Sequence, residues 1–439
     1  MLHRIVLKRA VLLTVLLFYM SGFASSVASA DTDRIPPGIH RIVVASDLHL
    51  NPDNRPDGSQ ITQSSYNMEL TDAMLWEAEH RAEILLLTGD LVHSGRWYRH
   101  EALVEKLHAA EEAGLRIYVL PGNHDLAPVT QTEFAALYAD FGYAEAYSRD
   151  ESSLSYCIIS DDLMLLMMDT GGYPLSAFDL PYAAEDALSF VTDRYAVSGP
   201  VFLSDRTLRW AAAMIAEAQA RQLRVICAGH YNLLSPPSLV EGSGYYIYNG
   251  SSLTALLQEA KVPLYLSGHM HLRGVYQENG LTELMTECLT SYPVSCGILK
   301  LDGDNLRYDP LLLDVDTWAA SCGQSDPVLL HFSDWQETQR KQSAEKTVLG
   351  LASGKAVSKA ELSEAVKFFS SFLYAYWHGA LYQVSESLQT LPGYTVFSQI
   401  ASDSSYGPWV RGLLLDASPL LAGFDIPFEP ALRDMDICS

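Results

Sequence analysis

The sequence is short of several features that would point to common functions. Basic residues are few: 29 Lys and Arg stand against 53 Asp and Glu, for a formal net charge of −24. A chain this acidic is a poor candidate for wrapping nucleic acid or lying on anionic lipid. The six cysteines show neither C-x-x-C spacing nor the pattern of a small disulfide scaffold, and Cys227, inside the apolar run RVICAGH, is expected to be a buried free thiol. Beyond the first thirty residues, no apolar run reaches the roughly 20 residues that a membrane-spanning helix needs.

Residues 1–30 have the composition of an export signal. Three basic residues precede an apolar stretch from Ala10 to Met20, and small residues then lead to Ala28-Ser29-Ala30. This order is typical of a secretory signal peptide with an A-x-A cleavage site. A retained membrane anchor is the alternative, but the apolar stretch is about half as long as a spanning helix. Cleavage would take the net charge from −24 to −27, and we expect an exported protein, secreted or at the cell surface.

From Gly38 to about Asp316, short β-rich runs alternate with longer amphipathic stretches, which is typical of an α/β domain. Six runs of mostly Val, Ile and Leu predict strands that are buried on both faces. They read RIVVAS, AEILLLT, LRIYVL, LMLLMMD, RVICAG and PLYLSG. Helices are expected over residues 66–81, 101–113 and 205–221, and an irregular insertion rich in Gly, Pro, Asp and Ser over residues 171–205.

After about Asp316 the strand pattern stops. A helix is predicted over residues 333–351, and Ser358-Lys359-Ala360-Glu361 is a capping box that begins another, which runs to Gly379. The aromatic stripe on that second helix predicts a packing surface. We therefore expect a signal peptide at 1–30, the α/β domain at 31–316 and a smaller helical C-terminal domain at 317–439.

Five of the six predicted strands end in side chains that bind metals. In open α/β sheets, sites form where the chain leaves the carboxyl ends of strands, so we expect these side chains to converge. The ligand types are oxygen and nitrogen without thiolate, which suits Mn, Fe or Zn ions. Seven such ligands are too many for one tetrahedral ion and suit two ions that share a carboxylate. The seven are Asp47, His49, Asp90, Asn123, His230, His269 and His271.

The ordered blocks D-x-H, G-D, G-N-H-D, H and G-H-x-H resemble the calcineurin-like metallophosphoesterase superfamily over about residues 40–310. The resemblance implies an α/β fold of two facing mixed β-sheets flanked by helices, with a two-metal centre at one edge. Asp90 would bridge the two ions. The resemblance assigns Asp47, His49, Asp90 and His271 to the first ion, and Asp90, Asn123, His230 and His269 to the second.

The resemblance also implies catalytic roles for two residues outside the ligand set. His124 is the candidate acid that protonates the leaving oxygen, and Asp125 would orient the His124 ring. The two ions would provide a bridging hydroxide that attacks phosphorus. They would also let a strongly acidic chain accept an anionic phosphate ester.

Within the superfamily, the chain differs from two groups. It reads GDLVHSG and GNHD, so it lacks the phosphate-clamping Arg and the terminal Glu of protein serine/threonine phosphatases. His93 stands where purple acid phosphatases carry Tyr. Arg96 and Arg99, just beyond it, are expected in a solvated loop, with a contact to substrate phosphate as the alternative.

The motifs are most similar to the exported and cytoplasmic enzymes grouped as class III cyclic nucleotide phosphodiesterases. We therefore expect an exported two-metal hydrolase of small phosphodiesters, with cyclic nucleotides among the candidate substrates and no nucleic acid polymer as a partner. A phosphomonoesterase or nucleotide pyrophosphatase that uses the same site is the first alternative. A noncatalytic metal-binding interaction protein is the second.

Overall fold

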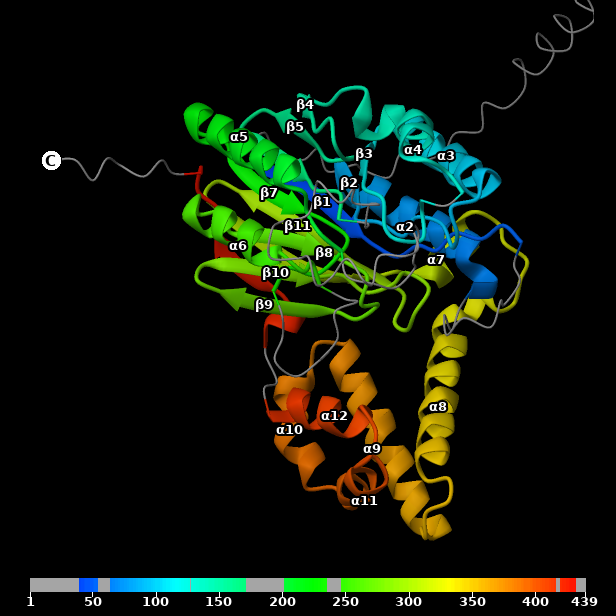
Figure 1. Cartoon of the computed structure of the whole chain (residues 1–439). Helices are drawn as coiled ribbons and strands as arrows, with labels where there is room; N and C mark the ends of the chain where they lie inside the picture. The colour runs from blue at the N-terminus through cyan, green and yellow to red at the C-terminus, as the bar shows by residue number, and fades with distance from the viewer. Residues whose placement is uncertain are drawn as a thin grey trace, which may run out of the picture. The chain divides into compact units, whose positions relative to one another are not determined.

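Two mixed β-sheets lie face to face, with helices on their outer surfaces (Figure 1). The computed structural model describes residues 39–53, 64–126, 128–170, 201–234, 246–415 and 419–431. The predicted signal peptide at 1–30 and most of the predicted insertion at 171–205 lie outside these ranges. The predicted α/β fold of two mixed sheets flanked by helices, with a helical C-terminal region, is confirmed.

The first sheet has the strand order β13-β12-β11-β1-β2-β3. Strands β1, β2 and β3 are parallel neighbours, and β11, β12 and β13 continue the sheet in antiparallel fashion from β1. The register places Val44 of β1 opposite Leu86 of β2, and Leu86 opposite Tyr118 of β3. The strands are β1 (Ile39–Ala45), β2 (Ile84–Leu87), β3 (Arg116–Val119), β11 (Ser295–Asp302), β12 (Asn305–Leu312) and β13 (Phe424–Pro427).

The second sheet has the order β4-β5-β6-β7-β8-β10-β9. Strands β6, β7, β8 and β10 are parallel, and antiparallel strands flank them on both sides. The strands are β4 (Ser148–Arg149), β5 (Tyr156–Ser160), β6 (Leu163–Met167), β7 (Arg224–Ala228), β8 (Leu264–Ser267), β9 (Gly274–Glu278) and β10 (Leu281–Met285).

The second sheet is apolar on both faces because it separates two cores. Along β7, Ile226 and Ala228 belong to the core between the sheets, whereas Val225 and Cys227 belong to the core under helices α5 and α6. Successive side chains of a strand point to opposite faces, so a strand between two cores needs an unbroken apolar run. This is why β6, β7 and β8 could be predicted from such runs. Cys227 is a buried free thiol, as predicted.

The helices match the predicted segments closely where those segments are amphipathic. Helix α5 has the predicted ends, whereas α3 begins at Trp97, four residues before the predicted start, because its first turn carries exposed aromatics and not an apolar stripe. Helices α5 and α6 lie over the second sheet in Figure 1. The helices of this part are α2 (Asn67–Arg81), α3 (Trp97–Glu112), α4 (Gln131–Leu137), α5 (Asp205–Arg221) and α6 (Gly250–Glu259).

The C-terminal region is mainly helical, as predicted. Ser358 caps α9 through the predicted capping box with Glu361. The buried aromatic stripe of α9 packs on α11, where the rings of Phe369 and Phe397 stack 4.8 Å apart, so the stripe is a packing surface as predicted. The helices are α7 (Val315–Ser321), α8 (Phe332–Leu351), α9 (Lys359–Trp377), α10 (Leu381–Gln389), α11 (Pro392–Ile400) and α12 (Tyr406–Leu415).

One expectation for this region is wrong: strands do not stop at residue 316. Strand β13 pairs with β12 at the edge of the first sheet, with Phe424 opposite Tyr308. A four-residue strand of sequence FDIP is too short to stand out in an otherwise helical region. Among the described residues, none of the helices is both long and apolar enough to cross a membrane.

Candidate metal centre

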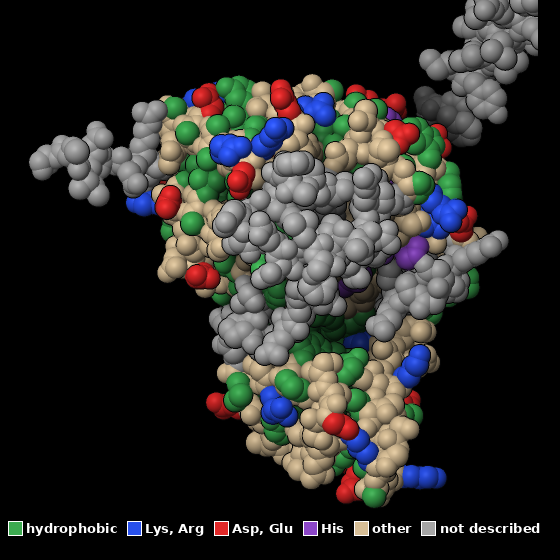
Figure 2. All heavy atoms as spheres, viewed as in Figure 1, with side chains coloured by type: hydrophobic (Ala, Val, Ile, Leu, Met, Phe, Trp, Pro, Cys, Tyr) green, Lys and Arg blue, Asp and Glu red, His purple; other side chains and the backbone are tan. Residues whose placement is uncertain are grey.

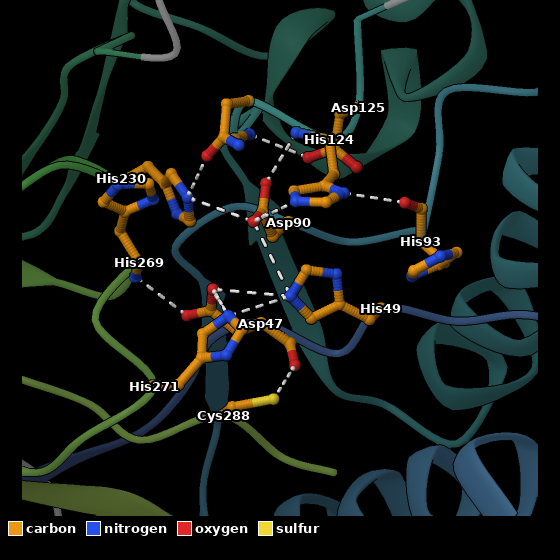
Figure 3. Close-up of polar contacts among 12 residues, drawn as sticks. Asp47, His49, Asp90, His93, His124, Asp125, His230, His269, His271 and Cys288 are labelled. Atoms are coloured by element: carbon orange, nitrogen blue, oxygen red, sulfur yellow. Dashed lines mark hydrogen bonds and ion pairs between the residues drawn. The ribbon is translucent and has the colours of Figure 1, made fainter. Parts of the chain in front are cut away.

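Loops at the carboxyl ends of five strands bring the candidate ligands together. Strands β1, β2 and β3 are parallel neighbours in one sheet, and β7 and β8 are parallel neighbours in the other, so their carboxyl ends open side by side. Figure 3 shows that the side chains from these loops point toward one another. The structure places all seven predicted ligands in this cluster.

One group of ligand atoms centres on Asp47. Its Oδ1 lies 3.2 Å from Nε2 of His271 and 3.7 Å from Nε2 of His49. The two Nε2 atoms are 3.1 Å apart. Oδ2 of Asp90 completes the group at 3.6 Å from Nε2 of His49. These four residues are the ones that the family resemblance assigns to the first ion.

A second group shares Asp90 with the first. Oδ2 of Asp90 lies 3.4 Å from Nε2 of His230, and Nε2 of His230 lies 3.2 Å from Oδ1 of Asn123. His269 contributes a further ring nitrogen within 4.8 Å of the ligand atoms of Asp90 and His230. Asp90 is therefore the one carboxylate present in both groups.

These spacings fit metal ions. Ligand atoms that lie about 2.1 Å from a tetrahedral ion lie about 3.4 Å from one another, and the separations in both groups scatter around that value. Oδ1 of Asp47 is buried and accepts no hydrogen bond from a described residue, so a cation would satisfy it. Nδ1 of His230 lies 2.9 Å from the carbonyl of Thr88, and donation there leaves the Nε2 lone pair directed at Asp90.

The ligand loops are held in strained backbone conformations. Asp47, His49, Asp90, His269 and His271 all have positive φ, between 44° and 66°. Each such residue costs about 1–3 kcal/mol and persists only when surrounding contacts enforce it. Close approach between loops is part of that enforcement. A Cβ on Gly122 would lie 2.2 Å from Oδ1 of Asp90, and one on Gly268 would lie 2.5 Å from Oδ2 of Asp47. The glycines of the motifs are thus needed because ligands of other loops pack against them.

His124 lies beside the ligands, but its orientation has a different origin from the one predicted. Its Nδ1 donates to the carbonyl of His93 at 2.8 Å, and its Nε2 faces Oδ2 of Asp90 at 3.9 Å. The buried carboxylate of Asp125 instead accepts hydrogen bonds from the backbone amides of Leu91, Val92 and Gly122. Asp125 therefore ties the loop after β3 to the loop after β2, and a main-chain oxygen orients His124. The expected Asp125–His124 pairing is wrong, because the carboxylate of Asp125 is bonded to three backbone amides and Nδ1 of His124 is bonded to the carbonyl of His93.

Burial and neighbouring charges shift the pKa values of the cluster. Burial opposes ionisation of Asp90, but the charges of His230 and His124 outweigh it and hold the pKa of Asp90 well below its usual range. Burial also opposes protonation of His230, but the negative charge of Asp90 outweighs burial and raises the pKa of His230 to about 9. Burial lowers the pKa of His49 to about 3. Burial, together with the charge of Asp90, raises the pKa of Asp125 to about 7. The cluster thus combines ionised carboxylates with at least one neutral imidazole, a donor set suited to cations.

Two residues that support the site carried no motif. Glu283 on β10 is fully buried, and its carboxylate accepts from Ser267 just before the G-H-x-H loop and from Asn232 just after His230. The thiol of Cys288 donates to the carbonyl of Asp47 at 3.0 Å. Neither could be found from spacing, because each acts through contacts between segments far apart in the chain.

Comparisons with known proteins identify two segments. Residues 40–273, more than half of the chain, match the family model described as calcineurin-like phosphoesterase. Residues 314–418 match the model described as the C-terminal domain of cyclic nucleotide phosphodiesterase. A search of curated proteins gives no match.

Solved structures that match this chain in a structural comparison share little sequence with it. A dimetal phosphatase from Danio rerio is 13% identical, with a TM-score of 0.48 over 62% of this chain and 96% of that one. A purple acid phosphatase from yellow lupin seeds is 14% identical, with a TM-score of 0.41 over 62% of this chain and 51% of that one. At these identities and TM-scores, the likenesses say nothing about substrate.

Proposed function

The chain belongs to the calcineurin-like phosphoesterase family, and from this premise we propose that it hydrolyses small phosphodiesters with two bound metal ions. The observation that carries the proposal is the position of Asp90. Its carboxylate belongs to both groups of ligand atoms and lies beside His124. A carboxylate shared by two groups of ligand atoms, with an imidazole beside it, suits two-metal hydrolysis of a phosphate ester with acid catalysis at the leaving oxygen.

The ligands would be divided between the ions as the residue groups divide. Asp47, His49 and His271 would hold one ion and Asn123, His230 and His269 the other, with Asp90 common to both. When bound, the two cations would lower the pKa of water to provide a nucleophile and would neutralise charge on the phosphoryl oxygens. The metal could be Mn, Fe or Zn, because the donors are nitrogen and oxygen.

His124 would act on the leaving group. Because its Nδ1 donates to the carbonyl of His93, the proton available for transfer is the one on Nε2. That atom lies 3.9 Å from Oδ2 of Asp90, so it is directed toward the two groups of ligand atoms. The His124 side chain is 24% exposed, so a substrate can reach it, and it would deliver the Nε2 proton to the departing oxygen.

The preference for a diester is supported by two observations. Residues 314–418 match the C-terminal domain model of cyclic nucleotide phosphodiesterase. The guanidinium of Arg99, which lies in the first turn of α3 and not in a solvated loop as expected, is buried and is held by Ser94, Tyr98 and Asp53. It is therefore not available to bind the second negative charge of a phosphomonoester.

The distribution of charged side chains on the surface supports the proposal that the substrate is small. On the face drawn in Figure 2, the described Lys and Arg side chains are interspersed with Asp and Glu and form no continuous basic stripe. A nucleic acid polymer would need such a stripe to neutralise its phosphates.

The test compares bis-p-nitrophenyl phosphate with p-nitrophenyl phosphate on the Mn²⁺-loaded protein. We expect faster cleavage of the diester, two ions bound per chain, and loss of both binding and turnover in Asp90→Ala. Faster cleavage of the monoester would move the assignment to a phosphomonoesterase. Two bound ions without turnover of either ester would favour the noncatalytic binding protein.

We also propose that the enzyme acts outside the cytoplasm. The support is the order of basic, apolar and small residues within residues 1–30. Expression of the full chain with a C-terminal tag, followed by cell fractionation and N-terminal sequencing, tests this. A mature chain that begins near Asp31 outside the cytoplasm is expected, and an uncleaved cytoplasmic chain would refute export.

A further inference from the structure

The last turn of helix α9 is bonded to the loop that carries two of the candidate metal ligands. This loop contains His269 and His271, and Arg273 follows at its end, just before β9. The hydroxyl of Tyr376 donates to the carbonyl of Arg273 at 2.9 Å. The guanidinium of Arg273 donates in return to the carbonyl of Trp377 at 3.2 Å. The C-terminal region therefore contacts the metal-ligand loop through both the main chain and the side chain of one residue.

The contacts of Arg273 are buried and mutually supporting. Arg273 is 2% exposed and Glu287 is 1% exposed. Nε of Arg273 lies 3.0 Å from Oε1 of Glu287, and a second guanidinium nitrogen donates to Oγ of Ser295 at 3.0 Å. A buried guanidinium with this many partners can take few other positions. It holds the end of the loop against the segment that follows β10 and against β11, at the same time as against α9.

The helix end is suited to this contact. The carbonyls of Tyr374 and Tyr376 accept from the amides of His378 and Gly379, whereas the carbonyl of Trp377 accepts from Arg273. A cation at the carboxyl end of a helix satisfies such a free carbonyl and interacts favourably with the helix dipole.

Helix α9 is itself held rigidly by the C-terminal region. Its Phe368 and Phe369 pack on Phe397 of α11, with ring centroids 5.5 Å and 4.8 Å apart. The Tyr376 ring lies edge-on to Trp409 of α12 at 5.8 Å. The hydroxyl of Tyr376 is thus presented from a packed core.

The loop needs such support because its backbone is strained. His269 and His271 have φ of 66° and 57°, a conformation that outside contacts must enforce. The contacts at its start are with the loop after β1, where the amide of His269 donates to Oδ2 of Asp47 at 3.0 Å. Those at its end, through Arg273, are with α9. We infer that the C-terminal helical region serves as a clamp that positions His269 and His271 for metal binding, with Tyr376 and Arg273 as its positioning residues. The inference rests on the proposed two-metal site.

The test is Mn²⁺ affinity of the full chain carrying Tyr376→Phe, measured by competition with a chromophoric chelator. This variant keeps the packed ring and removes only the hydroxyl. We expect about 10-fold weaker binding, the lower end of the effect of outer-shell partners on metal affinity. We also expect the visible spectrum of the Co²⁺-loaded protein to change, because that spectrum reports ligand geometry and does not respond to stability alone.

Tyr406→Phe is the matched control. Tyr406 lies on α12, where its ring packs edge-on against Phe369 of α9 with centroids 5.9 Å apart, and the residue is 39% exposed. Removal of the Tyr406 hydroxyl should leave both Mn²⁺ affinity and the Co²⁺ spectrum unchanged. If Tyr376→Phe fails to fold, Arg273→Lys replaces it, since lysine keeps the charge beside Glu287 but cannot also reach Trp377 and Ser295 in the geometry of the guanidinium.

The outcomes separate this inference from the proposed function. Tyr376→Phe or Arg273→Lys with the Mn²⁺ affinity and Co²⁺ spectrum of the wild type would overturn the inference even if the wild type hydrolyses diesters well. A wild type that binds two ions but hydrolyses no phosphate ester would refute the proposed function. The affinity comparison would still decide whether the C-terminal region positions the ligands.

Discussion

The substitution Glu283→Gln tests whether the metal centre depends on a carboxylate that touches no metal ligand directly. Glu283 is fully buried. Its Oε1 accepts from Oγ of Ser267 at 2.6 Å and from Nδ2 of Asn232 at 3.1 Å, while its Oε2 accepts from the amide of Leu234 at 2.5 Å. It therefore joins the loop that carries His230 to the strand that precedes the G-H-x-H loop.

The hydrogen bonds set the size of the expected effect. Glutamine has one acceptor oxygen, so in either orientation its amide nitrogen faces Asn232 or Leu234, both of which are donors. A buried donor left without an acceptor costs about 1–3 kcal/mol. Burial raises the pKa of Glu283, so removing the charge offsets part of this loss. We expect a net loss of about 1–3 kcal/mol in the free energy of unfolding and a Mn²⁺ affinity about 10-fold lower or more.

The assays are urea unfolding of the metal-free protein and chelator competition for Mn²⁺. Glu386→Gln is the control, because Glu386 is exposed on α10 and should change the free energy of unfolding by less than about 0.5 kcal/mol. If Glu283→Gln matched this control in both assays, the reasoning that buried outer partners set the ligand positions would be refuted.

Three further predictions concern the site and its surroundings. Gly122→Ala would place a Cβ 2.2 Å from Oδ1 of Asp90. The amount of bound metal, measured by elemental analysis, should therefore fall, while the helix content, measured by circular dichroism, stays unchanged. In the control Gly350→Ala, the added Cβ lies in open space, so bound metal and helix content should both stay unchanged. His124→Gln should slow an ester with an alkyl leaving group by about 10²–10⁴ but barely slow one with p-nitrophenolate, which needs no proton; equal slowing of both would contradict the acid role. Burial lowers the pKa of His100 from 6.5 to about 4, although the hydrogen bond to the carbonyl of Asp125 acts in the opposite direction. The folded protein thus favours the neutral ring, and thermal stability should decline as the pH falls from 6.5 toward 4, less steeply in His100→Gln; parallel pH profiles would argue against this.

Much of the fold and of the site could be predicted from the sequence, for a local reason. A strand buried on both faces needs an unbroken apolar run, and RVICAG and PLYLSG carry that requirement within six residues. The motif blocks lie directly after those runs. Because parallel strands of one sheet end at one edge, the convergence of Asp47, Asp90 and Asn123 followed from the strands that precede them without knowledge of any contact.

What failed to be predicted depends on contacts between distant segments. The carbonyl of His93, and not Asp125, orients His124, and a main-chain oxygen leaves no trace in a sequence motif. Strand β13 is a strand only because β12 offers it a free edge.

The sequence by itself determined the candidate ligand set, the six buried strands and the capped helix α9, because motif spacing, apolar runs and capping act over a few residues. Only the tertiary structure decided which groups hold those ligands in place, since Glu283 and Tyr376 reach the ligand loops from segments remote in the chain. The physical reason is that a hydrogen bond depends on where the folded backbone brings its two partners, and local sequence does not encode that distance.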